Sequence, residues 1–114
     1  DADGIIGSTV FYESDPRPEV QDYVQKFLAR YEPEGITQCD AFSPCGYDAL
    51  RLLAEAIKEN GEDRDAISDH LSQVENFPGA IGEITFDENG DVHVPLKLLK
   101  IENGDFVPFE VGQN

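Results

Sequence analysis

The stretch that decides the fold is residues 41–57, which read AFSPCGYDALRLLAEAI. Its apolar side chains recur every three to four positions, a spacing that places them on one face of a helix. They are Tyr47, Leu50, Leu53, Ala54 and Ile57. The pair Asn60-Gly61 follows, and such a pair commonly ends a helix. The sequence therefore predicts a helix over residues 47–60.

Two further helices are predicted on either side of this one. Residues 18–31 carry apolar side chains at the same spacing, and the nearby Pro16, Pro18 and Glu19 suit a first helical turn. The apolar positions are Val20, Tyr23, Val24, Phe27, Leu28 and Tyr31. Residues 63–74 form a shorter pattern that begins with aspartates, which favour a helix start. Three helices are thus expected between residues 18 and 74.

Strand patterns flank the helices. Residues 4–12 are rich in β-branched and aromatic side chains without a helical period, which is typical of a strand. After Phe77-Pro78-Gly79 ends the helical region, Asn-Gly turns at 89–90 and 103–104 separate further strand patterns, the longest at 92–101. The tail is therefore predicted to form two hairpins.

The composition limits both the size of the fold and its partners. With 114 residues, of which 39% are hydrophobic, the chain can build one modest core. We expect a single partial domain of α/β class over residues 1–114, with a β-hairpin region at 82–110. The 24 acidic against 8 basic residues give a net charge of −16, which argues against nucleic-acid binding and membrane attachment. Because the chain opens at Asp1 without a signal peptide, we expect it to be a piece of something longer.

The two cysteines, Cys39 and Cys45, leave two interpretations open. A disulfide across their short loop would imply an oxidising compartment, whereas two free thiols fit the sequence equally well. No metal site is expected, because zinc needs about four ligands and His70 and His93 lie far away in sequence. A nucleophilic pair of Cys45 with either histidine is a minor alternative.

No motif in the sequence predicts catalysis or a cofactor. Asp87, Asn89 and Asp91 alternate as calcium ligands do, but the following positions lack the glycine and the glutamate that a calcium-binding loop requires. A hairpin turn explains these residues better. The chain also lacks a nucleophile elbow and a phosphate-binding glycine loop, so we expect no enzyme activity and no cofactor.

The order of these features resembles one known family. The strand at 4–12, the helix at 18–31 and the Tyr47-Asp48-Ala49 signature follow one another as in the C-terminal third of branched-chain amino-acid-type periplasmic solute-binding proteins. Residues 77–91, FPGAIGEITFDENGD, resemble a second stretch of the same family. The resemblance covers nearly the whole chain, and the Tyr47-Asp48-Ala49 signature is its sharpest part.

The resemblance implies a type I periplasmic-binding-protein fold, in which two α/β lobes enclose a ligand. The strand at 4–12 would come from the hinge region, and the helices would cover a mainly parallel sheet whose strands lie mostly upstream. The chain would be part of a periplasmic or extracellular receptor that captures a small amino acid or amide for an ABC permease. The alternative is an excised or engineered structural module that self-associates and has no ligand of its own.

Four residues are implied as candidates for ligand binding. Phe42 and Ser43 precede the second helix, where relatives place a loop beside the cleft, and Phe11 and Tyr12 end the strand near the hinge. The competing interpretation makes Phe42 a hydrophobic staple at the helix start and places Phe11 or Tyr12 in the core. Tyr47 and Asp48 are assigned to packing and capping. Because Phe27, Leu28, Leu50, Leu53 and Ile57 would lose their cover, the isolated chain is expected to self-associate or to co-purify with the rest of its parent.

Overall fold

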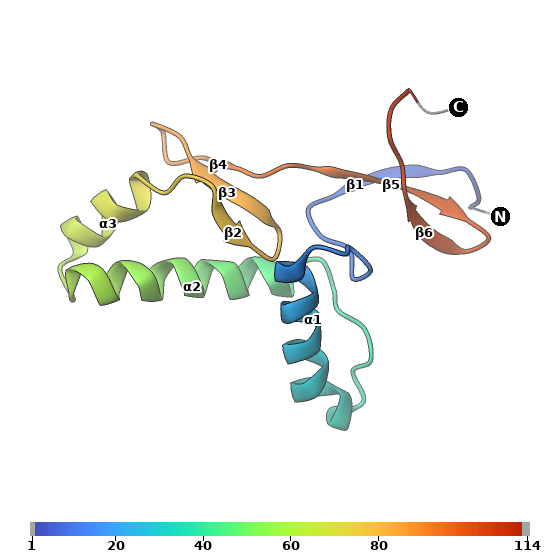
Figure 1. The fold of residues 1–114 in the computed structure, drawn as a ribbon, viewed down its shortest axis with the longest axis horizontal. Helices are drawn as coiled ribbons and strands as arrows, with labels where there is room; N and C mark the ends of the chain where they lie inside the picture. The colour runs from blue at the N-terminus through green and yellow to red at the C-terminus, as the bar shows by residue number, and fades with distance from the viewer. Residues whose placement is uncertain (1, 113–114) are drawn as a thin grey trace.

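The computed structural model describes residues 2–112, which form helices and two groups of strands (Figure 1). In chain order the elements are β1 (Ile6–Thr9), α1 (Pro18–Tyr31), the 3-10 helix η1 (Glu32–Glu34), α2 (Ser43–Asn60), α3 (Arg64–Ser72), β2 (Phe77–Gly79), β3 (Gly82–Phe86), β4 (Val92–His93), β5 (Lys97–Glu102) and β6 (Asp105–Pro108). Within the described residues, no helix is long and apolar enough to cross a membrane.

The helices follow the apolar spacing of the sequence, but α2 begins earlier than predicted. Helix α1 spans the expected residues, whereas α2 starts at Ser43 rather than at residue 47. The cause is Asp40, whose carboxylate accepts the backbone N–H groups of Phe42 and Ser43, both at 2.7 Å. The hydroxyl of Ser43, followed by these backbone N–H groups, holds the pKa of Asp40 below its usual value. Capping by a residue outside the apolar pattern thus extends the helix by one turn.

The strands form two three-stranded sheets, ordered β1-β5-β6 and β2-β3-β4. All strand pairs within residues 2–112 are antiparallel, so the mainly parallel sheet expected from the sequence is not built by these strands. The predicted long strand at 92–101 is also wrong. It is broken around Pro95, which has no N–H to donate to a ladder, so β4 and β5 join different sheets. Strand β2 was not predicted at all.

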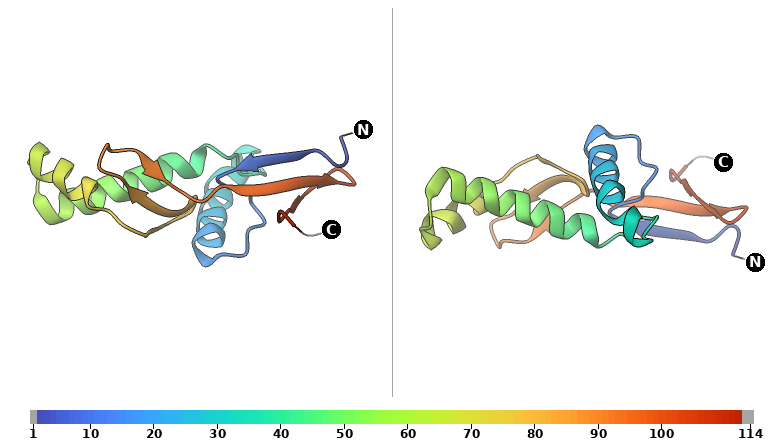
Figure 2. Two further views of the ribbon diagram at one scale, coloured as in Figure 1. Left: turned by 90° about the horizontal axis from the view of Figure 1, so that it is seen from above. Right: turned by 90° about the horizontal axis from the view of Figure 1, so that it is seen from below.

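The molecule consists of an arm and a body. The arm is the sheet of β1, β5 and β6, and the body contains the helices and the sheet of β2, β3 and β4 (Figure 1). Two connections join them: the outgoing crossing, residues 10–17, and the returning crossing, residues 94–96. Figure 2 shows the arm projecting beyond the helices. The radius of gyration is 16.6 Å, whereas a compact domain of this length has about 13 Å. The chain is therefore an open structure.

Two small clusters form the core, and both lie in the body or at its junction with the arm. The first contains Phe11, Val20, Tyr23, Val24 and Ala80, and the second contains Leu52, Phe77, Ile81 and Ile84. Phe27 and Leu28, which were expected to be uncovered, are half-buried against the first cluster.

An apolar face of α2 remains uncovered, as the sequence predicted. Leu50, Leu53 and Ile57 are 67%, 41% and 40% exposed. They lie three and four positions apart and so share one side of the helix. This uncovered face, together with the open shape, indicates that the described residues do not enclose all of their own apolar surface.

Candidate functional site

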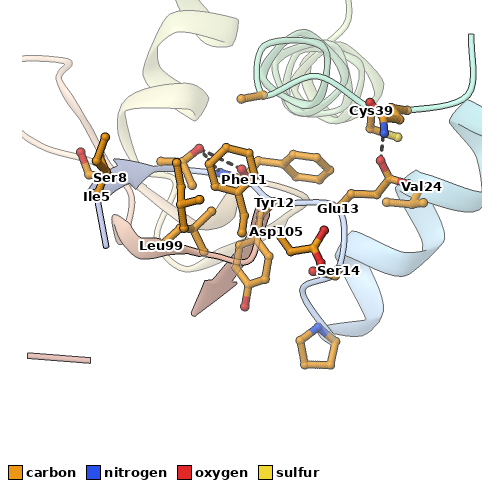
Figure 3. A pocket seen from close by; sticks show the side chains of 18 of the residues that line it. Ile5, Ser8, Phe11, Tyr12, Glu13, Ser14, Val24, Cys39, Leu99 and Asp105 are labelled. Atoms are coloured by element: carbon orange, nitrogen blue, oxygen red, sulfur yellow. Dashed lines mark hydrogen bonds between the residues drawn. The ribbon is translucent and has the colours of Figure 1, made fainter. Parts of the chain in front are cut away.

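A cavity of about 1120 Å³ lies between the arm and the body (Figure 3). It will be called the main cavity. Residues of β1, the outgoing crossing, the loop before α2 and the β5–β6 hairpin line it. Those used below are Ser8, Thr9, Phe11, Tyr12, Glu13, Ser14, Gln38, Cys39 and Asp105. The main cavity is open to solvent, so the described residues supply only part of an enclosure.

The end of β1 directs two aromatic residues to the main cavity. The hydroxyl of Thr9 accepts the N–H of Phe11 at 3.2 Å and donates to the carbonyl of Phe11 at 2.8 Å, which turns the chain out of the sheet. Phe11 is 3% exposed and packs edge-on against Tyr23, with ring centroids 5.6 Å apart. Tyr12 is half-buried, and burial, followed by the charge of Asp15, raises its pKa. Phe11 therefore belongs both to the first core cluster and to the wall of the main cavity.

Hydrogen bonds hold the polar side of the main cavity in place. Glu13 Oε2 accepts the backbone N–H of Cys39 at 3.0 Å and so ties the loop before α2 to the outgoing crossing. The side-chain amide of Gln21 donates to the carbonyls of Glu13 and Asp15, at 3.0 and 2.7 Å. These bonds place carboxylate and hydroxyl groups beside the aromatic wall. The described residues contain no cluster of His, Cys, Asp and Glu that could hold a metal ion.

The four predicted site residues are not brought together. Phe11 and Tyr12 line the main cavity, but Ser43 lines a second cavity of about 500 Å³ among aromatic residues of α1 and α2. Phe42 lines neither cavity and is 84% exposed. The reason is the capping of α2, because Asp40 holds the backbone of both residues and also accepts the hydroxyl of Ser43.

Sequence reasoning did not find the polar residues of the main cavity. Glu13 and Ser14 directly follow the predicted aromatic pair, so their position in the chain was a usable signal. Gln38 and Asp105 reach the cavity from distant segments, and only the folded topology brings them there. A single sequence contains no pattern that links them.

Comparison with known proteins assigns a family to this arrangement. The sequence profile of a family described as "Periplasmic binding protein" matches residues 1–105. The chain belongs to that family. The predicted family and its type I fold class are thereby confirmed, since solved proteins of this fold cover about 95% of the chain.

Two solved periplasmic binding proteins match most of this chain. The leucine-binding protein LivK from Thermotoga maritima shares 27% identity, with a TM-score of 0.76, over 96% of this chain and 31% of that protein. An ABC transporter substrate-binding protein from Desulfitobacterium hafniense in complex with Leu shares 27% identity, with a TM-score of 0.81, over 95% of this chain and 32% of that protein. The chain spans about a third of the length of these structures.

Curated relatives are matched over a smaller part of their length. The Leu/Ile/Val-binding protein BraC3 of Rhizobium johnstonii is 34% identical over 74 residues, which cover 62% of this chain and 20% of that protein. Atrial natriuretic peptide receptor 2 of Homo sapiens is 26% identical over 112 residues, covering 87% of this chain and 11% of the receptor. The chain thus corresponds to a minor part of each relative.

The structure of this periplasmic binding protein segment has Cys39 and Cys45 as free thiols. The disulfide considered from the sequence is not formed in it, because Cys39 packs against the first core cluster and Cys45 against the second. Burial, followed by the charges of Glu13 and Asp40, raises the pKa of Cys39 to about 11. Burial also raises the pKa of Cys45. His70 and His93 contact Asn60 and Asp87 rather than a thiol, so no Cys–His pair supports catalysis.

Both thiols should react slowly with iodoacetamide at neutral pH. The rise in the pKa of Cys39 from 9.0 to about 11 lowers its thiolate fraction roughly a hundredfold below that of an ordinary cysteine, and only the thiolate reacts. The rate should therefore increase as the pH rises toward that pKa. Mass spectrometry of the unreduced, denatured chain should show two alkylated cysteines. A chain that reacts only after reduction would establish the disulfide instead.

Proposed function

We propose that this chain is part of a periplasmic or extracellular solute-binding receptor that captures a small amino acid or amide for an ABC permease. The observation that carries the proposal is the position of the main cavity, which lies between arm and body and is open to solvent. An open cavity at the junction of two parts suits a ligand that is enclosed when a second wall approaches. The matched ABC transporter substrate-binding protein from Desulfitobacterium hafniense, which was solved in complex with Leu, supports the same class of solute.

The chemistry of the main cavity fits such a ligand. The rings of Phe11 and Tyr12 can contact an apolar side chain, while Ser8 and Ser14 offer hydroxyl groups. The carboxylates of Glu13 and Asp105 favour a ligand ammonium group, as does the net charge of −16. These groups bind and orient a ligand, and none is arranged to transfer a proton or form a covalent bond to it.

A structural module without a ligand is the second candidate. The exposed apolar face of Leu50, Leu53 and Ile57 favours it, because such a face can drive self-association. The two candidates differ in what they require. A receptor needs a ligand that stabilises the intact protein, whereas a structural module needs only a partner surface.

The proposed function can be tested by calorimetric titration of the intact parent protein with L-leucine, L-isoleucine and L-valine. At least one should bind at a single site. Tyr12→Ala should weaken that binding roughly tenfold or more, since it removes an aromatic contact from the wall. Phe42→Ala is the matched control, because this exposed ring lines neither cavity and its loss should leave affinity unchanged. Equal effects of the two variants would contradict the assignment of the main cavity.

A further inference from the structure

The turn between β2 and β3 is held by three charged side chains from three different segments. Asp48 of α2 accepts the N–H of Ala80 at Oδ1 and the N–H of Ile81 at Oδ2, both at 2.9 Å. Arg17 donates to the carbonyl of Ala80 at 3.3 Å, and Lys97 donates to the carbonyl of Ile81 at 3.1 Å. All four backbone polar groups of this turn are thus satisfied by ionised groups, which make stronger hydrogen bonds than neutral ones.

Lys97 differs from the other two because its ammonium group also binds a backbone carbonyl of the outgoing crossing. Its ammonium group donates to the carbonyl of Val10 at 2.7 Å, in addition to that of Ile81. Val10 begins the outgoing crossing, Lys97 begins β5 at the end of the returning crossing, and Ile81 belongs to the body. One side chain therefore connects the outgoing crossing, the returning crossing and the body.

The Lys97 ammonium group is partly removed from water, which makes its two hydrogen bonds important. The side chain is half-buried, and burial, then the nearby charge of Arg17, lowers its pKa, while Asp15 opposes that change. Asp15 is 3% exposed and pairs with Arg17 at 3.0 Å, so its charge is already shared. A partly desolvated ammonium group needs its acceptors, because an unpaired one is costly to bury. Lys97 therefore needs the carbonyl groups of Val10 and Ile81 as hydrogen-bond acceptors.

This geometry also connects Lys97 to the main cavity. Val10 directly precedes Phe11 and Tyr12, the aromatic wall. A rotation of the arm against the body must either pivot about the Lys97 ammonium group or break its hydrogen bond to Ile81, because Lys97 begins β5 of the arm and Ile81 belongs to the body.

We propose that Lys97 is a positioning residue that fixes the arm relative to the body and so sets the place of the Phe11–Tyr12 wall. Its role in ligand binding rests on the function proposed above, but its role at the junction does not. Lys97 acts through the backbone of Val10 and need not touch the ligand. Because one flexible side chain makes both hydrogen bonds to carbonyl groups, the arm can rotate against the body while the separation of the two parts stays limited.

The test uses the intact parent protein with spin labels on cysteines introduced at Glu102 in the arm and Glu59 in the body, in a background with Cys39→Ser and Cys45→Ser. Both labelled positions are exposed. The distance distribution between the labels is measured for the unsubstituted residue, for Lys97→Arg and for Lys97→Met. We expect a narrow distribution for the first two and a broadened or shifted one for Lys97→Met, because methionine keeps the length of the side chain but has no donor.

Titration with L-leucine supplies the second measurement. If leucine binds the parent, Lys97→Met should weaken its affinity roughly tenfold, and Lys97→Arg should restore most of it. An unchanged distance distribution in folded Lys97→Met would overturn the proposal, whatever the affinity does. If Lys97→Met does not fold, Lys97→Leu, which also has no donor, is judged by the same criterion. A broadened distribution in a parent that binds none of the tested solutes would support the pivot and contradict the receptor function.

Discussion

Asp48→Ala should destabilise the chain by about 3–5 kcal/mol, the magnitude expected when a buried ionic and hydrogen-bonded group is removed. Asp48 is 1% exposed, and each of its oxygens accepts a backbone N–H of the turn at 2.9 Å. Alanine would leave both N–H groups buried without a partner. Since small domains are stable by only about 5–15 kcal/mol, this single change should remove much of the total.

Urea unfolding followed by circular dichroism measures this effect, with all variants at one low protein concentration so that association affects them equally. Asp48→Asn keeps one acceptor oxygen and should lie between the alanine variant and the unsubstituted chain. Asp22→Ala is the matched control, because Asp22 makes only an exposed ion pair with Lys26 and should change stability by about 0–1 kcal/mol. An Asp48→Ala variant as stable as this control would refute the role of the carboxylate.

Gly79→Ala should destabilise the chain by about 1–3 kcal/mol through overpacking. A Cβ at this position would lie 2.6 Å from Asp48 Oδ2, 2.8 Å from Ile84 Cδ1 and 2.9 Å from the carbonyl of Gly82. Because the added methyl group would push against the carboxylate that holds the turn, the loss includes weakened hydrogen bonds from Ala80 and Ile81. The same urea experiment measures it.

Gly46→Ala is the control for this substitution, and its expected effect has the opposite sign. Gly46 lies in α2, and a Cβ there would meet no atom within 4 Å. Alanine should therefore stabilise the chain by about 0.5–1 kcal/mol through its better helix propensity. If both glycine variants shifted stability in the same direction, steric crowding at Gly79 would not be the cause.

The sequence predicted most elements whose determinants are local. Helix α1 follows from its apolar spacing, and the β5–β6 turn follows from Asn103-Gly104, both of which adopt positive φ angles of 54° and 86°. The errors arose where a residue outside the periodic pattern, or one far away in the chain, decides where an element begins or ends. Asp40 extends α2, and Pro95 divides the predicted long strand. Asp48, expected to cap its own helix, instead holds a turn more than thirty residues away in the chain.

The candidate site was predictable only in part, for the same reason. Phe11 and Tyr12 reach the main cavity because a strand end is a local feature. Phe42 and Ser43 do not, because the capping by Asp40 directs them elsewhere. The contributions of Asp105 and Lys97 depend on the antiparallel pairing of β1 with β5, which brings together segments about ninety residues apart. Gln38 depends instead on the hydrogen bond from the N–H of the adjacent Cys39 to Glu13.

The central claim is that these 114 residues form one part of a larger two-lobed receptor. Sedimentation velocity of the isolated chain at micromolar concentration tests this claim most directly. The exposed face of Leu50, Leu53 and Ile57 is a surface that such a receptor would cover, and each large side chain forgoes roughly 1.5–3 kcal/mol while it stays in water. The account predicts self-association of the isolated chain and its reduction by Leu53→Lys combined with Ile57→Lys, with helix content unchanged. A compact, cooperatively melting monomer would contradict it, because these residues would then enclose their own core.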